Sequence, residues 1–330
     1  MSDLPRIATH LGPFGPGSDR YNPRGYKPGL GPEERIRQAA TVQGLDGVEL
    51  NFRGLVDEDT APAIKALLDE VGLACANVSM NVWGDGKWGL GSLSNPDPAI
   101  RRDAAEVIIQ GMKTARVLGC SLVSLWPGQD GFDYPFQVDY GRMVDWFIEG
   151  LQACADAVPD VRLCIEYKPK EPRTHLLADT AARTMWLIGK AARPNLGVLL
   201  DVGHGLYAYE NVAQSAVLLQ REGLLDLLHF NDNYGEWDWD MIPATVRFWE
   251  LLELVFWLRE SGYQGWYSID IIMPRGDATG AVQQSVTNIQ RLYRLTEKLD
   301  RQTLLHNLHG ADPLANLKLL SDQVFAALGA

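Results

Sequence analysis

The sequence has few of the residues that support disulfide, membrane or signal-peptide chemistry. It holds four cysteines among 330 residues, and none forms a C-x-x-C pair. We therefore expect reduced, buried thiols rather than a disulfide framework or a thiolate zinc site. No apolar run approaches membrane-spanning length, and residues 1–6 lack the apolar core of a signal peptide. These absences predict a cytoplasmic protein with no membrane partner.

Positive charge is also scarce. Thirty Lys and Arg residues stand against 42 Asp and Glu, for a net charge of −12. A nucleic-acid backbone is recognised by clustered Lys and Arg, so we expect no nucleic-acid partner. The hydrophobic fraction of 46% is ample for a large buried core.

Short apolar runs alternate with longer amphipathic stretches along most of the chain. This alternation is typical of an α/β protein with a (β/α)₈ (TIM) barrel. We expect one catalytic domain over residues 1–299 and a C-terminal helical extension over 300–330, whose apolar stripe packs on the barrel or on a neighbouring subunit. The expected strands cover 6–10, 47–51, 75–79, 121–126, 162–167, 196–201, 225–231 and 266–271, and the helices 32–43, 61–71, 96–118, 138–158, 180–191, 214–222, 246–260 and 281–299.

Residues of metal-ligand type follow several of these strands. TIM barrels place their chemistry at the C-terminal ends of the strands. Carboxylates and imidazoles buried there are costly unless a cation neutralises them, and oxygen and nitrogen ligands without thiolate suit Mg²⁺, Mn²⁺ or Co²⁺. The sequence therefore predicts a divalent-metal-dependent enzyme, with Glu166, Asp201, His204, His229, Asp238, Asp240 and Asp270 as the candidate ligands.

Other residues near strand ends are candidates for contacting a substrate. Lys168 follows Glu166 by two positions, and its ammonium could hold a substrate oxygen as charge develops. Aromatic faces such as those of Trp83 and Trp126 could pack on the C–H faces or an apolar group of a substrate. Each assignment has an alternative. Lys168 could be an ordinary surface lysine, the tryptophans could serve core or interface packing, and residues 238–240 could form a solvated acidic turn.

Several short motifs, in the same order along the chain, resemble those of xylose isomerase and its superfamily. Residues 166–173 (EYKPKEPR) are similar to the family's E-P-K-P-N-E-P-R, residues 202–204 (VGH) to part of its E-V-G-H, and residues 126–131 (WPGQDG) to its W-G-G-R-E-G turn. Asp238 and Asp240 match a D-x-D pair, Asp270 matches a final Asp, and Asn231 matches an Asn two residues after a ligand. We expect Asn231 and Asn51 to contact the substrate. The likeness covers roughly residues 108–278, about half the chain.

The resemblance implies two metals in each chain. One would be held by Glu166, Asp201, His229 and Asp270, and the second by Asp201, His204, Asp238 and Asp240, with Asp201 shared between them. His229 stands where xylose isomerase has an Asp and where the rhamnose-isomerase and ketose-epimerase branches have a His.

A further departure concerns opening of the sugar ring. Asn51 stands where xylose isomerase has a His that assists this step, and an amide cannot shuttle protons near neutral pH. His10, at the end of the first expected strand, is the replacement we consider.

The implied activity is that of an aldose–ketose isomerase acting on a small sugar by metal-assisted hydride shift. Lys168 would steady one oxygen, with Asp238 and Asp240 at the site of hydroxyl-proton removal and Glu166 as a ligand. A homodimer or homotetramer is expected from the resemblance.

Three alternatives stay open. The first is a one-metal ketose epimerase, or a lyase, dehydratase or C-glycoside-cleaving enzyme of the same superfamily. The second is a nuclease resembling endonuclease IV, which the six histidines and the acidic charge disfavour. The third is a non-catalytic sugar-binding barrel.

Overall fold

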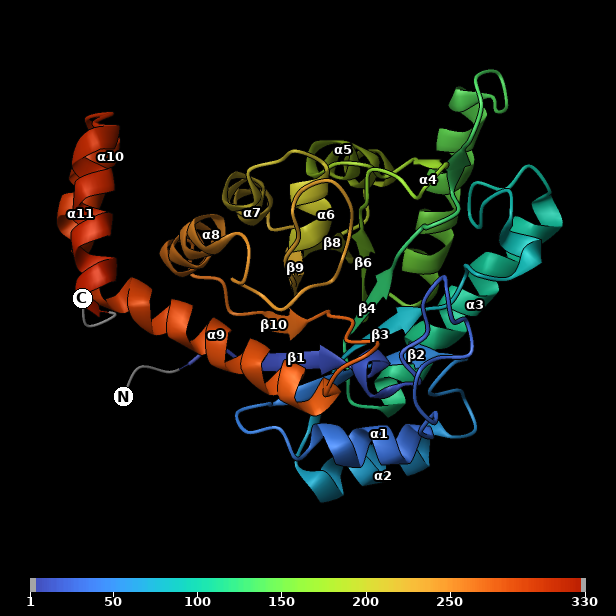
Figure 1. The fold of residues 1–330 in the computed structure, drawn as a ribbon. Helices are drawn as coiled ribbons and strands as arrows, with labels where there is room; N and C mark the ends of the chain where they lie inside the picture. The colour runs from blue at the N-terminus through green and yellow to red at the C-terminus, as the bar shows by residue number, and fades with distance from the viewer. Residues whose placement is uncertain (1–3, 328–330) are drawn as a thin grey trace.

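Eight parallel strands close into a barrel in the computed structural model, which describes residues 4–327 (Figure 1). The order around the barrel is β1-β10-β9-β8-β6-β4-β3-β2. This confirms the predicted TIM barrel. The strands are β1 (Ile7–His10), β2 (Gly47–Phe52), β3 (Ala74–Met80), β4 (Leu122–Leu125), β6 (Arg162–Glu166), β8 (Leu196–Asp201), β9 (Leu225–Phe230) and β10 (Trp266–Ile269).

Helices surround the strands and bury their apolar faces against them (Figure 1). Several begin at a side chain that accepts a backbone N–H of the first turn, as Asp97, Asp139 and Thr180 do. The bounds are α1 (Pro32–Ala39), α2 (Ala61–Val71), α3 (Pro98–Val117), α4 (Tyr140–Ala157), α5 (Ala181–Ala191), α6 (Val202–Tyr207), α7 (Val212–Arg221), α8 (Phe248–Glu260) and α9 (Ala278–Lys298), with 3₁₀ turns η1 (Gly12–Phe14) and η2 (Gly86–Trp88).

Strand register brings chemically active side chains level with one another at the barrel mouth. Asp201 of β8 is paired with His229 of β9, and His10 of β1 is paired with Glu49 of β2. The four cysteines are buried and unpaired, as expected. The core lies mainly between strands and helices, and a small cluster of Cys164, Leu199 and Leu227 forms a second one.

Two local elements were not anticipated by the periodicity. A two-residue antiparallel pair joins β5 (Gly131–Phe132) to β7 (His175–Leu176). The six-residue helix α6 follows β8 directly, where the sequence VGHGLY has two glycines and little helix propensity.

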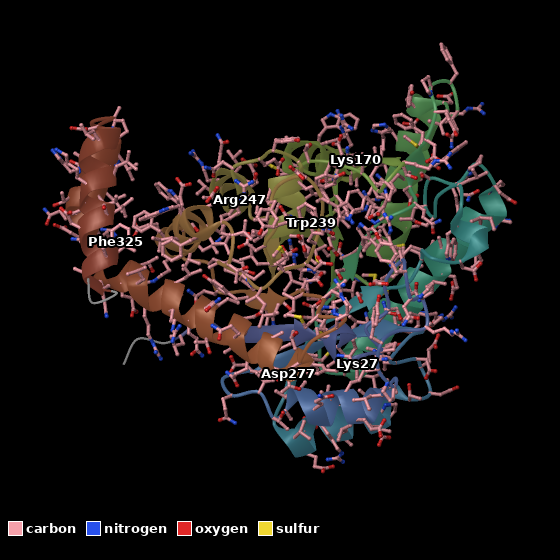
Figure 2. The ribbon with its side chains drawn as sticks, in the orientation of Figure 1. Lys27, Lys170, Trp239, Arg247, Asp277 and Phe325 are labelled. Carbon is pink, nitrogen blue, oxygen red and sulfur yellow. The ribbon has the colours of Figure 1, made fainter. Side chains whose placement is uncertain are left out.

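The C-terminal extension is helical, as predicted, but it is a hairpin rather than one stripe. It consists of α10 (Arg301–His309) and α11 (Pro313–Ala327), separated by a turn in which Ala311 has a φ of +52°. The hairpin stands at one side of the barrel, and Phe325 marks its position (Figures 1 and 2). Buried Leu304 packs with Phe256 and Leu299 and so ties it to the barrel.

The hairpin's status as a separate domain, with a boundary at residue 299, remains a prediction. No helix among residues 4–327 is long and apolar enough to cross a bilayer.

Candidate metal centre

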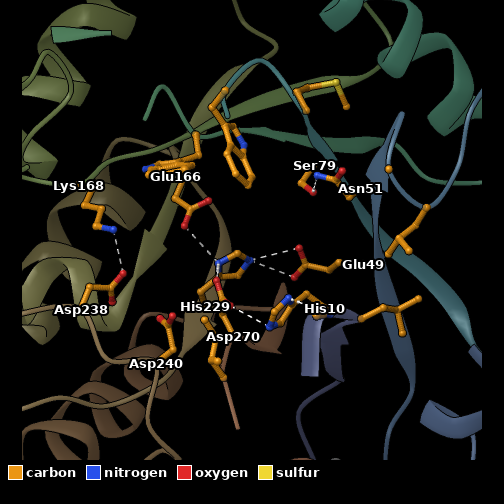
Figure 3. A pocket seen from close by; sticks show the side chains of 18 of the residues that line it. His10, Glu49, Asn51, Ser79, Glu166, Lys168, His229, Asp238, Asp240 and Asp270 are labelled. Atoms are coloured by element: carbon orange, nitrogen blue, oxygen red, sulfur yellow. Dashed lines mark hydrogen bonds and ion pairs between the residues drawn. The ribbon is translucent and has the colours of Figure 1, made fainter. Parts of the chain in front are cut away.

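A cavity of about 630 Å³ opens at the C-terminal ends of the strands (Figure 3). Asp201 and Asn231 are fully buried and are not among the residues that line it. The other candidate side chains do line it: His10, Asn51, Trp83, Trp126, Glu166, Lys168, His204, His229, Asp238, Asp240 and Asp270.

Four strand-end residues come together as one potential ligand group. One atom each from Glu166, Asp201, His229 and Asp270 lies within 4.8 Å of the others. His229 Nδ1 is 3.5 Å from Glu166 Oε1, 3.6 Å from Asp201 Oδ2 and 3.0 Å from Asp270 Oδ2. The arrangement offers three carboxylates and one imidazole to a single point.

The orientation of His229 depends on Glu49, which the sequence reasoning missed. His229 Nε2 lies 3.1 Å and 3.2 Å from the two carboxylate oxygens of Glu49 (Figure 3). Because Nε2 donates its proton to Glu49, Nδ1 is the ring nitrogen that faces the ligand group and is available to a cation. Glu49 is itself held by Asn77 Nδ2 at 2.7 Å and by the Ser268 hydroxyl. The sequence does hold one sign of this role: Glu49 is a charged residue between the apolar Val48 and Leu50 of a predicted strand.

A second potential group shares Asp201 with the first. Atoms of Asp201, His204 and Asp238 lie within 4.8 Å of one another, whereas Asp240, which we had expected as a fourth ligand, is not part of this group. His204 Nδ1 donates to the Tyr167 carbonyl at 2.9 Å, and Nε2 lies 3.1 Å from Asp238 Oδ2. Nε2 is therefore the nitrogen free to serve as a ligand.

Asp201 is fixed from two directions. One carboxylate oxygen accepts the His204 backbone N–H at 2.8 Å and so caps α6. Asn231 Nδ2 donates to both oxygens, at 3.2 and 3.0 Å. Asn231, expected to contact substrate, thus lies behind the ligands and positions Asp201.

The charges in this cluster are unbalanced. Burial opposes protonation of His204, but Asp201 and Asp238 outweigh it and raise its pKa to about 9. Burial and the charges of Asp238, Asp270 and Asp201 raise the pKa of Asp240 well above its usual range. So many carboxylates at close range hold protons that a cation would replace.

Within the two ligand groups, two buried polar atoms make no hydrogen bond of acceptable geometry to the described residues. They are His229 Nδ1 in the first group and Asp238 Oδ1 in the second. Both are atoms that can coordinate a cation, and buried polar atoms in proteins are rarely left without a partner. The residues present therefore fit a divalent metal with oxygen and nitrogen ligands.

Lys168 lies between two carboxylates beside the cavity. Its ammonium contacts Glu171 and is 3.1 Å from Asp238 Oδ2. Burial opposes its charge, but Asp238 and Glu171 outweigh this effect and raise its pKa. Lys168 is 6% exposed, so it is not the surface lysine that the sequence left open.

The loop that carries Asp238 is ordered by Asp232. The Asp232 carboxylate accepts backbone N–H groups of Thr245, Val246 and Arg247, and its carbonyl accepts from Met241. The Asp238 side chain is only 8% exposed. A solvated acidic turn is therefore not what is observed.

Tryptophans and short polar side chains form the remaining wall. Trp83 and Trp126 meet edge to face at 5.1 Å, and Lys168 Nζ lies 5.2 Å from the Trp126 ring centre. Asn51 Nδ2 donates to Ser79 Oγ at 3.3 Å (Figure 3). His10 Nδ1 accepts from the Gly12 N–H at 3.3 Å, and Nε2 lies 3.0 Å from Asp270 Oδ1.

Solved structures with the same fold include two named for epimerisation. One is described as a D-tagatose 3-epimerase-like protein, with 18% identity, a TM-score of 0.68 and coverage of 88% of this chain and 98% of that one. The other is an L-ribulose 3-epimerase, with 16% identity, a TM-score of 0.69 and coverage of 89% and 96%. At these identities the likeness concerns the fold.

Sequence comparison gives a relative named for isomerisation. The xylose isomerase of Thermus thermophilus is 27% identical over 236 residues, which cover 67% of this chain and 61% of the relative. The chain thus spans about three fifths of that relative's length. The family described as xylose isomerase-like TIM barrel matches residues 36–295, well beyond the segment that carried the motifs. The chain belongs to the xylose isomerase-like TIM barrel family.

Proposed function

We propose that this protein is a divalent-metal-dependent sugar isomerase that interconverts an aldose and a ketose by hydride shift. The observation that carries the proposal is the pair of ligand groups that share Asp201, each with one unpartnered coordinating atom. Mn²⁺, Mg²⁺ or Co²⁺ bound there would supply Lewis acidity toward adjacent sugar oxygens. Glu166, Asp201, His229 and Asp270 would hold one ion, and Asp201, His204 and Asp238, with Asp240 nearby, would hold a second.

The side chains around the cavity divide the remaining work. Lys168 is a fixed cation that can donate a hydrogen bond to a substrate oxygen as negative charge develops on it. Trp83 and Trp126 offer aromatic walls to the C–H groups of a small sugar. The buried Trp126 Nε1 has no partner among residues 4–327, and it can donate to a sugar hydroxyl.

Removal of the hydroxyl proton is assigned to Asp240. Of the two aspartates in the loop, Asp240 is the stronger base, because burial and neighbouring carboxylates raise its pKa. Burial would also raise the pKa of Asp238, but His204 and Lys168 outweigh it and lower that pKa. A carboxylate with a raised pKa is the stronger base once its own proton has been displaced, as a bound cation would do.

His10 is the group we assign to ring opening in place of Asn51. Its ring is held between Asp270 and the Gly12 N–H and lines the cavity. Asn51 lines the same cavity and can hydrogen-bond a hydroxyl without moving a proton.

A ketose epimerase is the second candidate. Glu166 and Asp270 both approach His229 Nδ1, so two carboxylates could serve as an acid and a base around one carbon. The structures named as epimerases share the fold. A lyase, dehydratase or C-glycoside-cleaving activity would use the same single-metal group.

Turnover in D₂O separates these candidates. We would measure bound Mn²⁺ per chain and react aldoses and ketoses in D₂O, following deuterium at carbon by NMR. Two ions and aldose–ketose conversion without carbon-bound deuterium are expected, because a hydride shift keeps the hydrogen within the substrate. One ion with solvent deuterium at the reacting carbon would contradict the isomerase proposal and favour epimerisation.

A pair of variants connects that result to the second ligand group. Asp238→Asn should retain one ion and lose conversion by at least about 100-fold, the scale of one charge-stabilising group. Asp103→Asn is the control, because Asp103 pairs with Lys87 at an exposed site. Two ions retained in Asp238→Asn would place the second ion elsewhere.

A further inference from the structure

Arg35 brings a guanidinium to the same cavity. It lies in the first turn of α1, which follows β1, and its Nε donates to the Leu30 carbonyl at 2.9 Å. Gly15 leaves room for it, because a Cβ there would lie 3.2 Å from Arg35 Nη1. The side chain is half-buried and lines the cavity.

Arg35 has no acidic partner among residues 4–327. Burial alone lowers its pKa, with no carboxylate to offset that effect. Two positions further along α1, Arg37 contacts both carboxylate oxygens of Glu70, at 2.8 and 3.3 Å. The cavity's other permanent cation, Lys168, contacts Glu171 and Asp238. The Arg35 guanidinium is thus partly desolvated, and no carboxylate of the described residues pairs with it.

The barrel places Arg35 on the opposite side from Glu166 and Lys168, although Asp270 of the acidic cluster follows β10, the neighbour of β1. In the closed strand order, β1 and β6 are separated by three strands in either direction. The helix after β1 carries Arg35, and β6 ends at Glu166, close to Lys168. A substrate held near Glu166 can therefore extend toward an unpaired positive charge.

We propose that Arg35 binds a carboxylate of the substrate, so that the substrate is a sugar acid of the uronate type rather than a neutral sugar. This inference rests on the proposed function, because it takes the cavity to be the sugar site. A planar guanidinium matches a carboxylate with two parallel N–H···O bonds. A single guanidinium balances a single negative charge, which favours a carboxylate over a phosphate dianion.

Matched sugars test this directly by calorimetry on the Mn²⁺-loaded protein. D-glucuronate is compared with D-glucose, and D-galacturonate with D-galactose, so that each pair differs only at carbon 6. We expect at least one uronate to bind about 10-fold or more tightly than its parent sugar, the scale of a charge-assisted hydrogen bond.

Two variants assign that preference to Arg35. Arg35→Met should reduce it to within about twofold, whereas Arg37→Met, the same change on the same helix outside the cavity, should leave it intact. Arg35→Lys should restore part of it, because the charge remains without the bidentate geometry.

Three results would overturn the inference. One is a preference that persists in Arg35→Met, which would place the carboxylate elsewhere, for example on the metal. Another is tighter binding of D-glucose 6-phosphate than of either uronate. The third is equal binding, or no binding, of all the sugars. Failure of the isomerase proposal would appear separately, in the metal count and the deuterium pattern.

Discussion

Glu49 shows how a residue outside the ligand groups can decide what they bind. It fixes the proton of His229 on Nε2 and leaves Nδ1 for the cluster. Such carboxylate partners commonly affect metal affinity by about 10- to 100-fold. No short motif carries this pair, because the two residues are 180 positions apart.

Replacing Glu49 should therefore weaken metal binding without unfolding the barrel. In Glu49→Gln, the amide no longer accepts the Nε2 proton as strongly, and we expect Mn²⁺ affinity to fall about 10- to 100-fold by calorimetry. Glu70→Gln, at an exposed ion pair with Arg37, is the control. Unchanged affinity in Glu49→Gln would mean that His229 is oriented by other contacts.

Strand-end residues could be found from sequence, whereas residues that act through packing could not. Glu166, Asp201, His229 and Asp270 were predictable because each follows an apolar run that ends at the barrel mouth. Arg35 was not, since an arginine in a first helical turn gives no sign that a partner is missing. Asn231 was predicted to contact the substrate, because its burial behind Asp201 depends on the tertiary fold and cannot be read from the sequence.

At the scale of elements, the long periodic segments were predictable and the short ones were not. All eight barrel strands and the main helices lie within a few residues of their predicted bounds. The helix α6 depends instead on its Asp201 cap, and the β5–β7 pair depends on contacts between distant segments.

The tail hairpin gives a prediction at this scale. Leu304 is 5% exposed and packs on Phe256, whereas Leu308 on the same helix is 42% exposed. Leu304→Asp should release the hairpin, because a buried carboxylate without a partner costs several kcal/mol. Hydrogen exchange should then rise across α10 and α11, while Leu308→Asp should have little effect.

The candidate metal centre should be unaffected by that release. No residue of α10 or α11 in the described part of the chain lines the cavity, so Mn²⁺ affinity should stay within about twofold of the original. Loss of metal binding in Leu304→Asp would contradict a domain boundary at residue 299. A change in oligomeric state, measured by light scattering, would support the predicted role of the tail in subunit contacts.

Across the whole molecule, the two ends of the barrel have different tasks. The cavity lies at the C-terminal strand ends, while Asp226 and Arg162, near the opposite ends of β9 and β6, form an ion pair at 2.7 Å. Gly197 is required beside them, because a Cβ there would lie 1.6 Å from Asp226 Oδ2. This ion pair therefore contributes to the fold at the end of the barrel opposite the cavity.

The pH dependence of global stability should report this ion pair. Burial raises the pKa of Asp226 from 3.8 to about 6, and Arg162 offsets this only in part. Because the folded-state pKa is the higher one, the folded protein holds more protons between these values. The contribution of Asp226 to the free energy of unfolding is therefore fully present below pH 3.8 and is lost as the pH rises through about 6.

We therefore compare the free energy of unfolding of the wild type with that of Asp226→Asn. Between pH 4 and 7 the wild-type value should fall, relative to the variant's, by at most about 3 kcal/mol. Urea titrations of both proteins across this range test the expectation, and equal pH dependence would contradict it. Mn²⁺ affinity at pH 7 should be the same in both, since the pair lies far from the cavity.

Asp201 belongs to both ligand groups, caps α6 through the His204 N–H, and is gripped by Asn231. Any replacement there would alter two potential ligand groups, the start of α6 and the contact with the Asn231 amide together, and no single neighbouring change would compensate all of them. Substitutions at positions 201, 204 and 231 should therefore be correlated among homologues. Asn51 and Arg35 hydrogen-bond to Ser79 and to the Leu30 carbonyl rather than to the ligand groups, so divergence toward new substrates would begin on their side of the barrel.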